Sequence, residues 1–191
     1  MSNPAVFYRG AGIGTYWHGH DARISGFSPI LPGAARNTAT LKSHVIHGTL
    51  RSPYISLTKS FGVAADYARM GRAVPNASMK AYVYVIHLPK SAGSGVHLLD
   101  PLVEILSSHK DPLKSDYHHD GVQDFLLSIV KPSSFPINPA HYLQPPPAGG
   151  TLRAPNLTDD LQTMVRALRD SEILAVGTIP ASCVVDRIEI P

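Results

Sequence analysis

The sequence predicts an α+β fold organised as one domain, and two kinds of pattern support this. Residues 54–58 alternate apolar and polar side chains, and residues 81–88 are rich in β-branched and aromatic side chains, as strands are. Residues 61–68 and 159–169 instead repeat their apolar positions at helical spacing. The chain has 191 residues, 43% of them hydrophobic, which is enough to build one buried core.

The first part of the chain is predicted to contribute one strand and an irregular segment. Residues 5–9 are mostly apolar or aromatic and are followed by Gly10, which predicts a short strand that ends there. Residues 10–50 contain glycines, prolines and scattered histidines with little periodicity, so we expect loops and one short helix.

The period of the sequence pattern changes after Thr58. Before this point, alternation places Tyr54, Ser56 and Thr58 on one face of a strand. After it, apolar residues follow the i, i+3, i+4, i+7 spacing of a helix face, starting at Phe61. The hydroxyl of Thr58 or of Ser60 can cap the start of this helix.

The last part of the chain is predicted to contain two strands and a helix. Residues 81–88 form the clearest strand, which ends at Pro89, and residues 184–190 form a closing strand. A helix fits residues 159–169, and its apolar stripe is formed by Leu157, Leu161, Met164, Val165 and Leu168.

Residues 89–156 follow no pattern that assigns them a role. Residues 131–155 are rich in proline, and residues 124–130 are compatible with a helix or a strand. We therefore expect a single domain over residues 1–191 with a large insertion at about 89–156.

Composition excludes several classes of protein. No apolar run approaches the roughly 20 residues that span a bilayer, and the first residues show no Sec signal peptide. Cys183 is the only cysteine, so no intramolecular disulfide can form, and we expect Cys183 to be a small buried hydrophobe. The formal net charge of +3 permits a nucleic acid or an acidic protein as partner but requires neither.

Three residues have the chemistry to bind a dinucleotide and cleave the bond to its nicotinamide. Nicotinamide leaves as a neutral amine, so the reaction depends on stabilising the oxocarbenium-like ribose rather than on acid catalysis. A carboxylate such as Glu172 can supply that stabilisation. Arg9 can bind a diphosphate through its planar fork, and the hydroxyl of Ser56 can hold the carboxylate in one rotamer.

These residues stand in segments that resemble ADP-ribosyltransferases of the Arg-Ser-Glu class, the group that includes cholera toxin and the heat-labile enterotoxins. Residues 6–10 (Val-Phe-Tyr-Arg-Gly) are similar to the first strand of that family, which carries its NAD-binding arginine. Residues 54–58 (Tyr-Ile-Ser-Leu-Thr) stand where the family has Ser-Thr-Ser, and residues 82–86 match the strand that follows. Residues 172–180, with their Gly-x-Ile-Pro continuation, resemble the segment of the catalytic glutamate.

The resemblance implies a fold and a function. The fold would have two small, mostly antiparallel sheets packed face to face around an NAD cleft, with flanking helices. The protein would be an NAD-dependent mono-ADP-ribosyltransferase that uses NAD as a substrate and needs no metal. It would be a secreted or translocated bacterial effector or toxin, monomeric and without a membrane partner, that modifies a host protein in the cytoplasm of a target cell.

The resemblance also implies roles for individual residues. Glu172 would be the catalytic carboxylate, Ser56 would orient it, and Asp170 would activate the acceptor. The expected cofactor-binding residues are Arg9, Gly10, Tyr8 and Thr58.

Two positions depart from the family pattern. Leu57 replaces the middle hydroxyl residue, but its side chain points to the opposite face of the strand. Asp170 stands two positions before Glu172, where the family carries Glu or Gln, and its shorter side chain leaves the class of acceptor open. Three alternatives therefore remain: an NAD glycohydrolase, a transferase that modifies nucleic acid, and an inactive family member that acts as a binding module.

Other candidate sites are weaker. Glu104, within residues 101–106 (Pro-Leu-Val-Glu-Ile-Leu), is a rival carboxylate, but no Gly-x-Ile-Pro continuation follows it. A cluster in one loop lacks regular metal-ligand spacing, so we expect solvated residues there; it comprises His109, Asp116, His118, His119 and Asp120. The Gly-x-Gly-x-Gly run at 10–14 is not followed by the helix of a Rossmann fingerprint.

Overall fold

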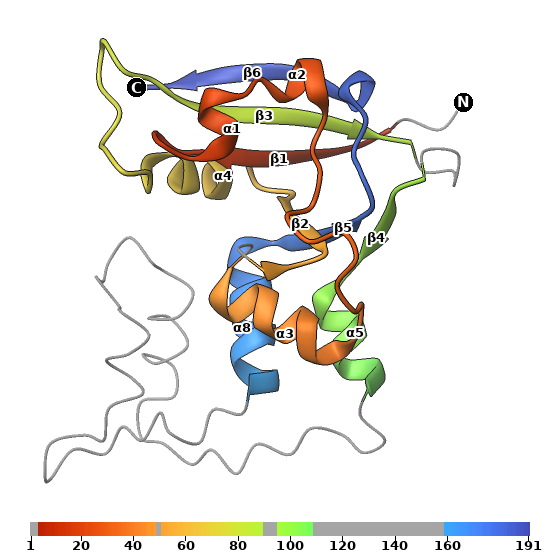
Figure 1. Ribbon diagram of the computed structural model, residues 1–191. Helices are drawn as coiled ribbons and strands as arrows, with labels where there is room; N and C mark the ends of the chain where they lie inside the picture. The colour runs from red at the N-terminus through yellow and green to blue at the C-terminus, as the bar shows by residue number, and fades with distance from the viewer. Residues whose placement is uncertain (1–3, 49–50, 90–94, 109–158) are drawn as a thin grey trace, which may run out of the picture.

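The computed structural model describes residues 4–48, 51–89, 95–108 and 159–191, which form one antiparallel sheet with helices on its faces (Figure 1). The strands are β1 (Ala5–Ala11), β2 (Tyr54–Thr58), β3 (Ala81–Leu88), β4 (His97–Leu99), β5 (Glu172–Val176) and β6 (Val184–Ile190). The helices are α1 (Tyr16–Gly19), α2 (Ala22–Ser25), α3 (Thr38–His47), α4 (Phe61–Arg69), α5 (Pro101–Ser108), α8 (Asp159–Asp170) and the 3₁₀ helix η5 (Ala181–Cys183). The strand order is β4-β5-β2-β1-β3-β6.

The sheet consists of two three-stranded halves. One half contains β1, β3 and β6, the other contains β2, β5 and β4, and the two meet where Tyr8 pairs with Thr58 (Figure 1). One apolar core is shared between them, because Phe7 and Tyr84 from the first half pack in it together with Leu57 and Ile173 from the second. The predicted α+β fold is confirmed, and the two small sheets that we expected are joined by hydrogen bonds at this one pair.

Helices cover the outer face of each half. The alanine face of α4, formed by Ala64, Ala65 and Ala68, packs with Ala81 and Val83 of β3. A second group of helices, α3, α5 and α8, covers β5, where Leu41, Ile105 and Met164 pack against Leu174 and Val176. Arg166 of α8 also donates from Nη1 to the carbonyl oxygen of Ile46, which ties α8 to α3. Glu172 therefore begins a strand, β5, that is packed against these helices, and Ser56 lies within β2, the strand that pairs with it.

Most predicted elements are confirmed with small changes of length. The strands β2, β3 and β6 have the expected bounds, and β1 extends to Ala11. Ser60 caps α4 by accepting a hydrogen bond from the backbone N–H of Val63 at 3.3 Å. In α8, however, Leu168 is 61% exposed, so the predicted apolar stripe is wrong at that position. Cys183 is half-buried and packs against the shared core.

The expectation of one short helix within residues 10–50 is wrong, because three helices form there. Local side chains explain two of them. Asp21 caps α2 by accepting from the N–H of Arg23, and Asn37 and Thr40 form a reciprocal capping box at the start of α3. Such caps need only a few polar residues, and they form without the long apolar periodicity that we used to find helices.

Part of the segment left unassigned by the sequence belongs to the fold. Residues 97–99 form β4, which pairs with β5, and residues 101–108 form α5, whose Ile105 is fully buried. The apolar run of β5 itself was not predicted as a strand. The segments 124–130 and 131–155 lie outside the described residues. Within the described parts of the chain, no helix is long and apolar enough to cross a membrane.

A glycine pair tests the contact between β1 and α4. A Cβ added at Gly10 would lie 2.2 Å from the carbonyl oxygen of Ala64, whereas at Gly62 within α4 the nearest atom lies at 3.8 Å. We expect Gly10→Ala to lower the free energy of unfolding by about 2–3 kcal/mol through overpacking. Gly62→Ala should raise it by about 0.5–1 kcal/mol through better helix propensity. Urea denaturation of both variants measures this, and equal effects would contradict the close packing of β1 on α4.

Candidate active site

The segment that carries the predicted catalytic glutamate is anchored to β2 by its backbone. Helix α8 ends at Asp170, and Ser171 adopts a left-handed conformation (φ 46°) that turns the chain into β5. Glu172 then pairs with Thr58 across the sheet. The Thr58 hydroxyl donates to the carbonyl oxygen of Asp170 at 2.5 Å, and the N–H of Lys59 donates to the carbonyl oxygen of Ser171 at 3.3 Å. The start of β5 is therefore fixed relative to the end of β2.

Glu172 is a buried carboxyl group, since its side chain is only 10% exposed. Burial raises its pKa to about 7, and the charge of Asp170 acts in the same direction. A hydrogen bond from the Ser56 side chain opposes that shift, as do the charges of Arg9 and Arg169. The carboxyl group is thus poised to change charge near neutral pH.

A histidine that the sequence did not identify contacts both predicted catalytic residues. The Nε2 atom of His44, in α3, lies 2.7 Å from Ser56 Oγ and 3.7 Å from Glu172 Oε1, and its Nδ1 atom lies 2.6 Å from Ser52 Oγ. Burial, assisted by the charge of Arg9, lowers the pKa of His44 to about 3. His44 is therefore neutral at pH 7, with one ring nitrogen that donates and one that accepts.

The hydrogen bond from Ser56 to Glu172 determines the direction of this chain. If Ser56 gives its only proton to the carboxylate, its oxygen must accept from His44 Nε2–H. His44 Nδ1 then carries no proton and accepts from the hydroxyl of Ser52, whose oxygen accepts from the N–H of Tyr54 at 3.0 Å. The buried donors and acceptors are all matched in this arrangement, and it leaves a donor directed at Glu172.

Arg9 lies between this series of hydrogen bonds and a cavity. Its Nη1 atom donates to the carbonyl oxygen of Ser56 at 2.5 Å, and its guanidinium carbon lies 5.6 Å from the centre of the Phe27 ring. Its buried Nε atom has no hydrogen-bond partner among the described residues. Burial lowers the pKa of Arg9 to about 10, while the charge of Glu172 acts to raise it. A buried donor without a partner is costly unless a ligand satisfies it.

The cavity that Arg9 lines has a volume of about 920 Å³, within the range of small-molecule sites. Its walls come from five segments: Arg9 and Gly10 of β1, residues 14–17, Ser25 with residues 28–30, Tyr54 and Ile55 of β2, and residues 70–72 after α4. Ser56 and Glu172 are not among its lining residues. Arg9 is thus the side chain that connects the cavity to the buried carboxyl group.

Asp170 is brought close to Glu172, but its own carboxylate is already engaged. Arg169 donates to both of its oxygens at 2.7 Å, and the Tyr67 hydroxyl donates to Oδ2 at 2.6 Å. Burial and the charge of Asp170 raise the pKa of Tyr67, so this hydroxyl keeps its proton. The role of Asp170 as acceptor-activating group stays a prediction, and its present contacts hold it in one position.

The other predicted cofactor-binding residues differ in their placement. Gly10 lines the cavity, and it also allows β1 to approach α4 closely. The Tyr8 ring packs edge-on against Phe61 at 5.7 Å, on the face of β1 opposite to Arg9. The Thr58 hydroxyl is buried and bonded to protein atoms. Binding of the cofactor by these residues stays a prediction.

No metal centre is found among the residues that the structure describes, because no three potential ligands come together there. Glu104, the rival carboxylate, lies in the first turn of α5. The loop cluster of His109, Asp116, His118, His119 and Asp120 lies outside the described residues.

Four residues that contact the candidate site were missed by sequence reasoning: His44, Ser52, Tyr67 and Arg169. His44 was one of several scattered histidines, and nothing in its spacing to Ser56 distinguishes it. The Asn37–Thr40 capping box could have revealed the helix that carries it. Arg169 adjoins Asp170 in sequence, but adjacency alone does not predict a bidentate pair.

Glu172→Gln tests the buried ionisation. Because the folded state raises this pKa, it binds a proton more tightly than the unfolded chain, and wild-type stability falls as the pH rises from about 4.5 through about 7. Gln cannot ionise, so the free energy of unfolding of the variant relative to wild type should increase between pH 4.5 and pH 8.5 by up to about 3 kcal/mol. Urea denaturation at both pH values measures this. Glu189→Gln, at an exposed position of β6, should show no such increase, and equal behaviour of the two variants would contradict the buried carboxyl.

The chain matches no protein-family model and no curated protein. Among solved structures it is similar to EcPltA, an ADP-ribosyltransferase toxin subunit, with a TM-score of 0.46 and 16% identity over 97% of this chain and 75% of that one. It is also similar to a nicked CARDS toxin, an ADP-ribosylating toxin, with a TM-score of 0.46 and 16% identity over 98% of this chain and 26% of that one. The chain thus spans about a quarter of the second toxin's length. At this TM-score and identity, neither likeness carries an argument about this chain.

Proposed function

We propose that the protein is an NAD-dependent mono-ADP-ribosyltransferase that transfers ADP-ribose from NAD to a macromolecule, with a protein as the acceptor. The observation that carries this proposal is the grouping of Glu172, Ser56 and Arg9. A buried carboxyl group, a hydroxyl that orients it and a buried arginine with a free donor lie together, and the arginine lines a cavity of about 920 Å³. As inferred from the resemblance of these segments, the protein would act as a secreted or translocated toxin or effector in a target cell.

In the proposed reaction, each residue has a distinct task. NAD is the substrate, and Arg9 binds its phosphate or ribose. As the glycosidic bond breaks, its electron pair leaves with nicotinamide, and the ribose carbon becomes oxocarbenium-like. Ionised Glu172 stabilises that positive charge. The acceptor nucleophile then adds to the same carbon and loses a proton. Ser56 and His44 are positioning residues, because they hold the carboxylate through hydrogen bonds.

A second candidate function, NAD glycohydrolase, is favoured by one observation. The carboxylate of Asp170, which would activate a macromolecular acceptor, is held by Arg169 and Tyr67. If these contacts persist with NAD bound, water can take the place of the acceptor, and the products would be nicotinamide and free ADP-ribose.

The two candidates separate in one experiment. Wild type and Glu172→Gln are incubated with NAD labelled in its adenylate part and a eukaryotic cell lysate, and each sample is divided between protease and nuclease. The proposal predicts a labelled band, made only by wild type, that protease removes. Removal by nuclease would assign a nucleic acid as acceptor, and nicotinamide release without any labelled macromolecule would assign the glycohydrolase. Binding of NAD without release would overturn the enzymatic proposal in favour of a binding module.

The rate of nicotinamide release should depend on the ionisation of Glu172. Because burial raises its pKa to about 7, the carboxyl group of the free protein is protonated below that pH and cannot stabilise positive charge. We expect kcat/KM for nicotinamide release to rise with pH, to reach half of its maximum near pH 7 and to level off above that. Glu172→Gln should reduce kcat by about 10²–10³ at pH 8. A profile that is flat from pH 5 to 8, or a variant as active as wild type, would contradict the role of Glu172.

A further inference from the structure

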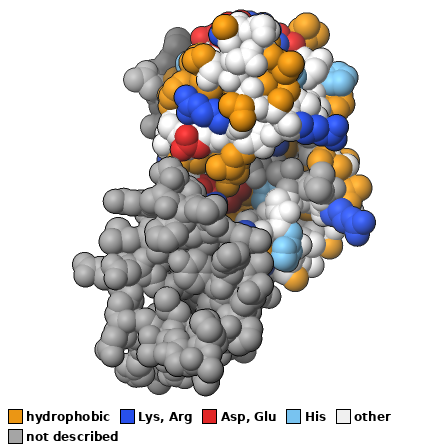
Figure 2. Space-filling model, turned by 90° about the vertical axis from the view of Figure 1, so that its left-hand side faces the viewer, with side chains coloured by type: hydrophobic (Ala, Val, Ile, Leu, Met, Phe, Trp, Pro, Cys, Tyr) orange, Lys and Arg blue, Asp and Glu red, His pale blue; other side chains and the backbone are white. Residues whose placement is uncertain are grey.

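A second arginine, Arg72, lines the same cavity as Arg9 but comes from a different part of the fold. It lies three residues after the end of α4, in the connection to β3 that runs along the left edge of the molecule in Figure 1. Figure 2 shows that face, where Lys and Arg side chains lie among hydrophobic ones. The cavity is therefore walled by a cation at β1 and by another at the exit of α4.

The backbone around Arg72 is fixed to the exit of β1. Its N–H donates to the carbonyl oxygen of Ile13 at 2.7 Å, and Gly71 lies so close to Gly12 and Ile13 that neither glycine has room for a side chain. These contacts join the segment after α4 to the segment after β1. The base of the Arg72 side chain is thus held in place by the fold.

The stem of Arg72 is accommodated by a glycine. Gly14 has a φ of +80°, and a Cβ added there would lie 2.8 Å from Cδ and 3.0 Å from Cγ of Arg72. Gly14 therefore supplies both an unusual backbone conformation and the space along which the arginine stem lies. Both residues line the cavity.

Among the residues that the structure describes, no acidic partner pairs with the guanidinium group of Arg72. Four other arginines do pair with carboxylates: Arg23 and Arg187 with Asp21, Arg69 with Asp66, and Arg169 with Asp170. No carboxylate in the described parts of the chain pairs with Arg72, and none is among the lining residues of the cavity. Arg72 is exposed, as a solvated surface arginine would be, but its stem lies along Gly14, and the cavity that it lines also contains Arg9 with its unsatisfied donor.

We propose that Arg72 is a second anion-binding residue of this cavity, which binds the diphosphate of the dinucleotide together with Arg9. The inference rests on the proposed function in that the ligand is NAD. A diphosphate carries two negative charges, and arginine forks bind phosphate oxygens in two places. Two arginines on separate walls match such a group, and an acidic ligand is favoured because no carboxylate lines the cavity.

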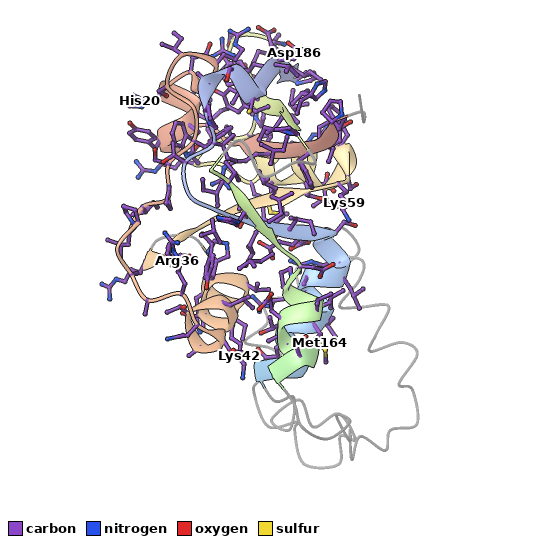
Figure 3. All side chains as sticks on the ribbon, turned by 90° about the vertical axis from the view of Figure 1, so that its right-hand side faces the viewer. His20, Arg36, Lys42, Lys59, Met164 and Asp186 are labelled. Carbon is purple, nitrogen blue, oxygen red and sulfur yellow. The ribbon has the colours of Figure 1, made fainter. Side chains whose placement is uncertain are left out.

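The test compares Arg72→Gln with Arg36→Gln. Arg36 is an exposed arginine on the connection between α2 and α3, does not line the cavity, and gives the same change of net charge (Figure 3). Isothermal titration calorimetry measures the binding of NAD and of ADP-ribose, which both carry the diphosphate. We expect Arg72→Gln to weaken both affinities about tenfold or more, and Arg36→Gln to leave both unchanged. Arg72→Lys keeps the charge without the planar fork of arginine, so its affinities should fall less than those of Arg72→Gln.

Each outcome decides between the assignments. Equal affinities of the two Gln variants for NAD would overturn the role of Arg72 and leave the proposed function intact. A wild type that binds neither NAD nor ADP-ribose would overturn the proposed function itself, and the role of Arg72 with it. Steady-state nicotinamide release gives a second readout: the KM for NAD should rise in Arg72→Gln while kcat stays within about twofold. A loss of kcat with unchanged KM would show that Arg72 does not act by binding the diphosphate. Thermal unfolding of all variants confirms that they are folded.

Discussion

The arrangement of the site depends on the hydrogen bonds of Thr58. Its backbone pairs with Tyr8 of β1 on one side and with Glu172 of β5 on the other. Its buried hydroxyl donates to the carbonyl oxygen of Asp170, where α8 ends. One residue therefore sets the register between the two halves of the sheet and the position of the segment before β5. That register places the arginine of β1 beside the serine of β2 and the glutamate of β5.

The same arrangement places a carboxyl group where ionisation is costly. Burial raises the pKa of Glu172 to about 7, and a hydroxyl from Ser56 and the charges of Arg9 and Arg169 partly offset the cost of the charged form. Groups that destabilise a fold in this way are concentrated at functional sites. Beside this carboxyl group, Arg9 lines the cavity with a buried Nε donor that has no partner among the described residues. A buried ionisable carboxyl group and an unsatisfied buried donor therefore lie next to each other.

The parts of the fold that the sequence predicts are those with a strong local pattern. Alternation over residues 54–58, the β-branched run 81–88 and the helical spacing after Phe61 all correspond to elements of the structure. The short helices before residue 50 depend on caps, and residues 97–108 are ordered by packing against β5 and α8, so neither has a long periodic signal. For the site, Arg9, Ser56 and Glu172 were found from their chemistry and from the resemblance of their segments to a known family. His44 was not found, because its role comes from a tertiary contact.

The ionisation and tautomer of His44 test this account most directly. The chain of hydrogen bonds from Tyr54 through Ser52, His44 and Ser56 requires a neutral ring with its proton on Nε2. Two-bond ¹H–¹⁵N NMR spectra of the His44 ring between pH 5 and 8 measure both properties. The account predicts the Nε2–H tautomer throughout, with no titration in that range, because the pKa of His44 is lowered to about 3. A ring that carries its proton on Nδ1, or one that titrates near 6.5, would contradict the hydrogen bonds that hold Ser56 toward Glu172.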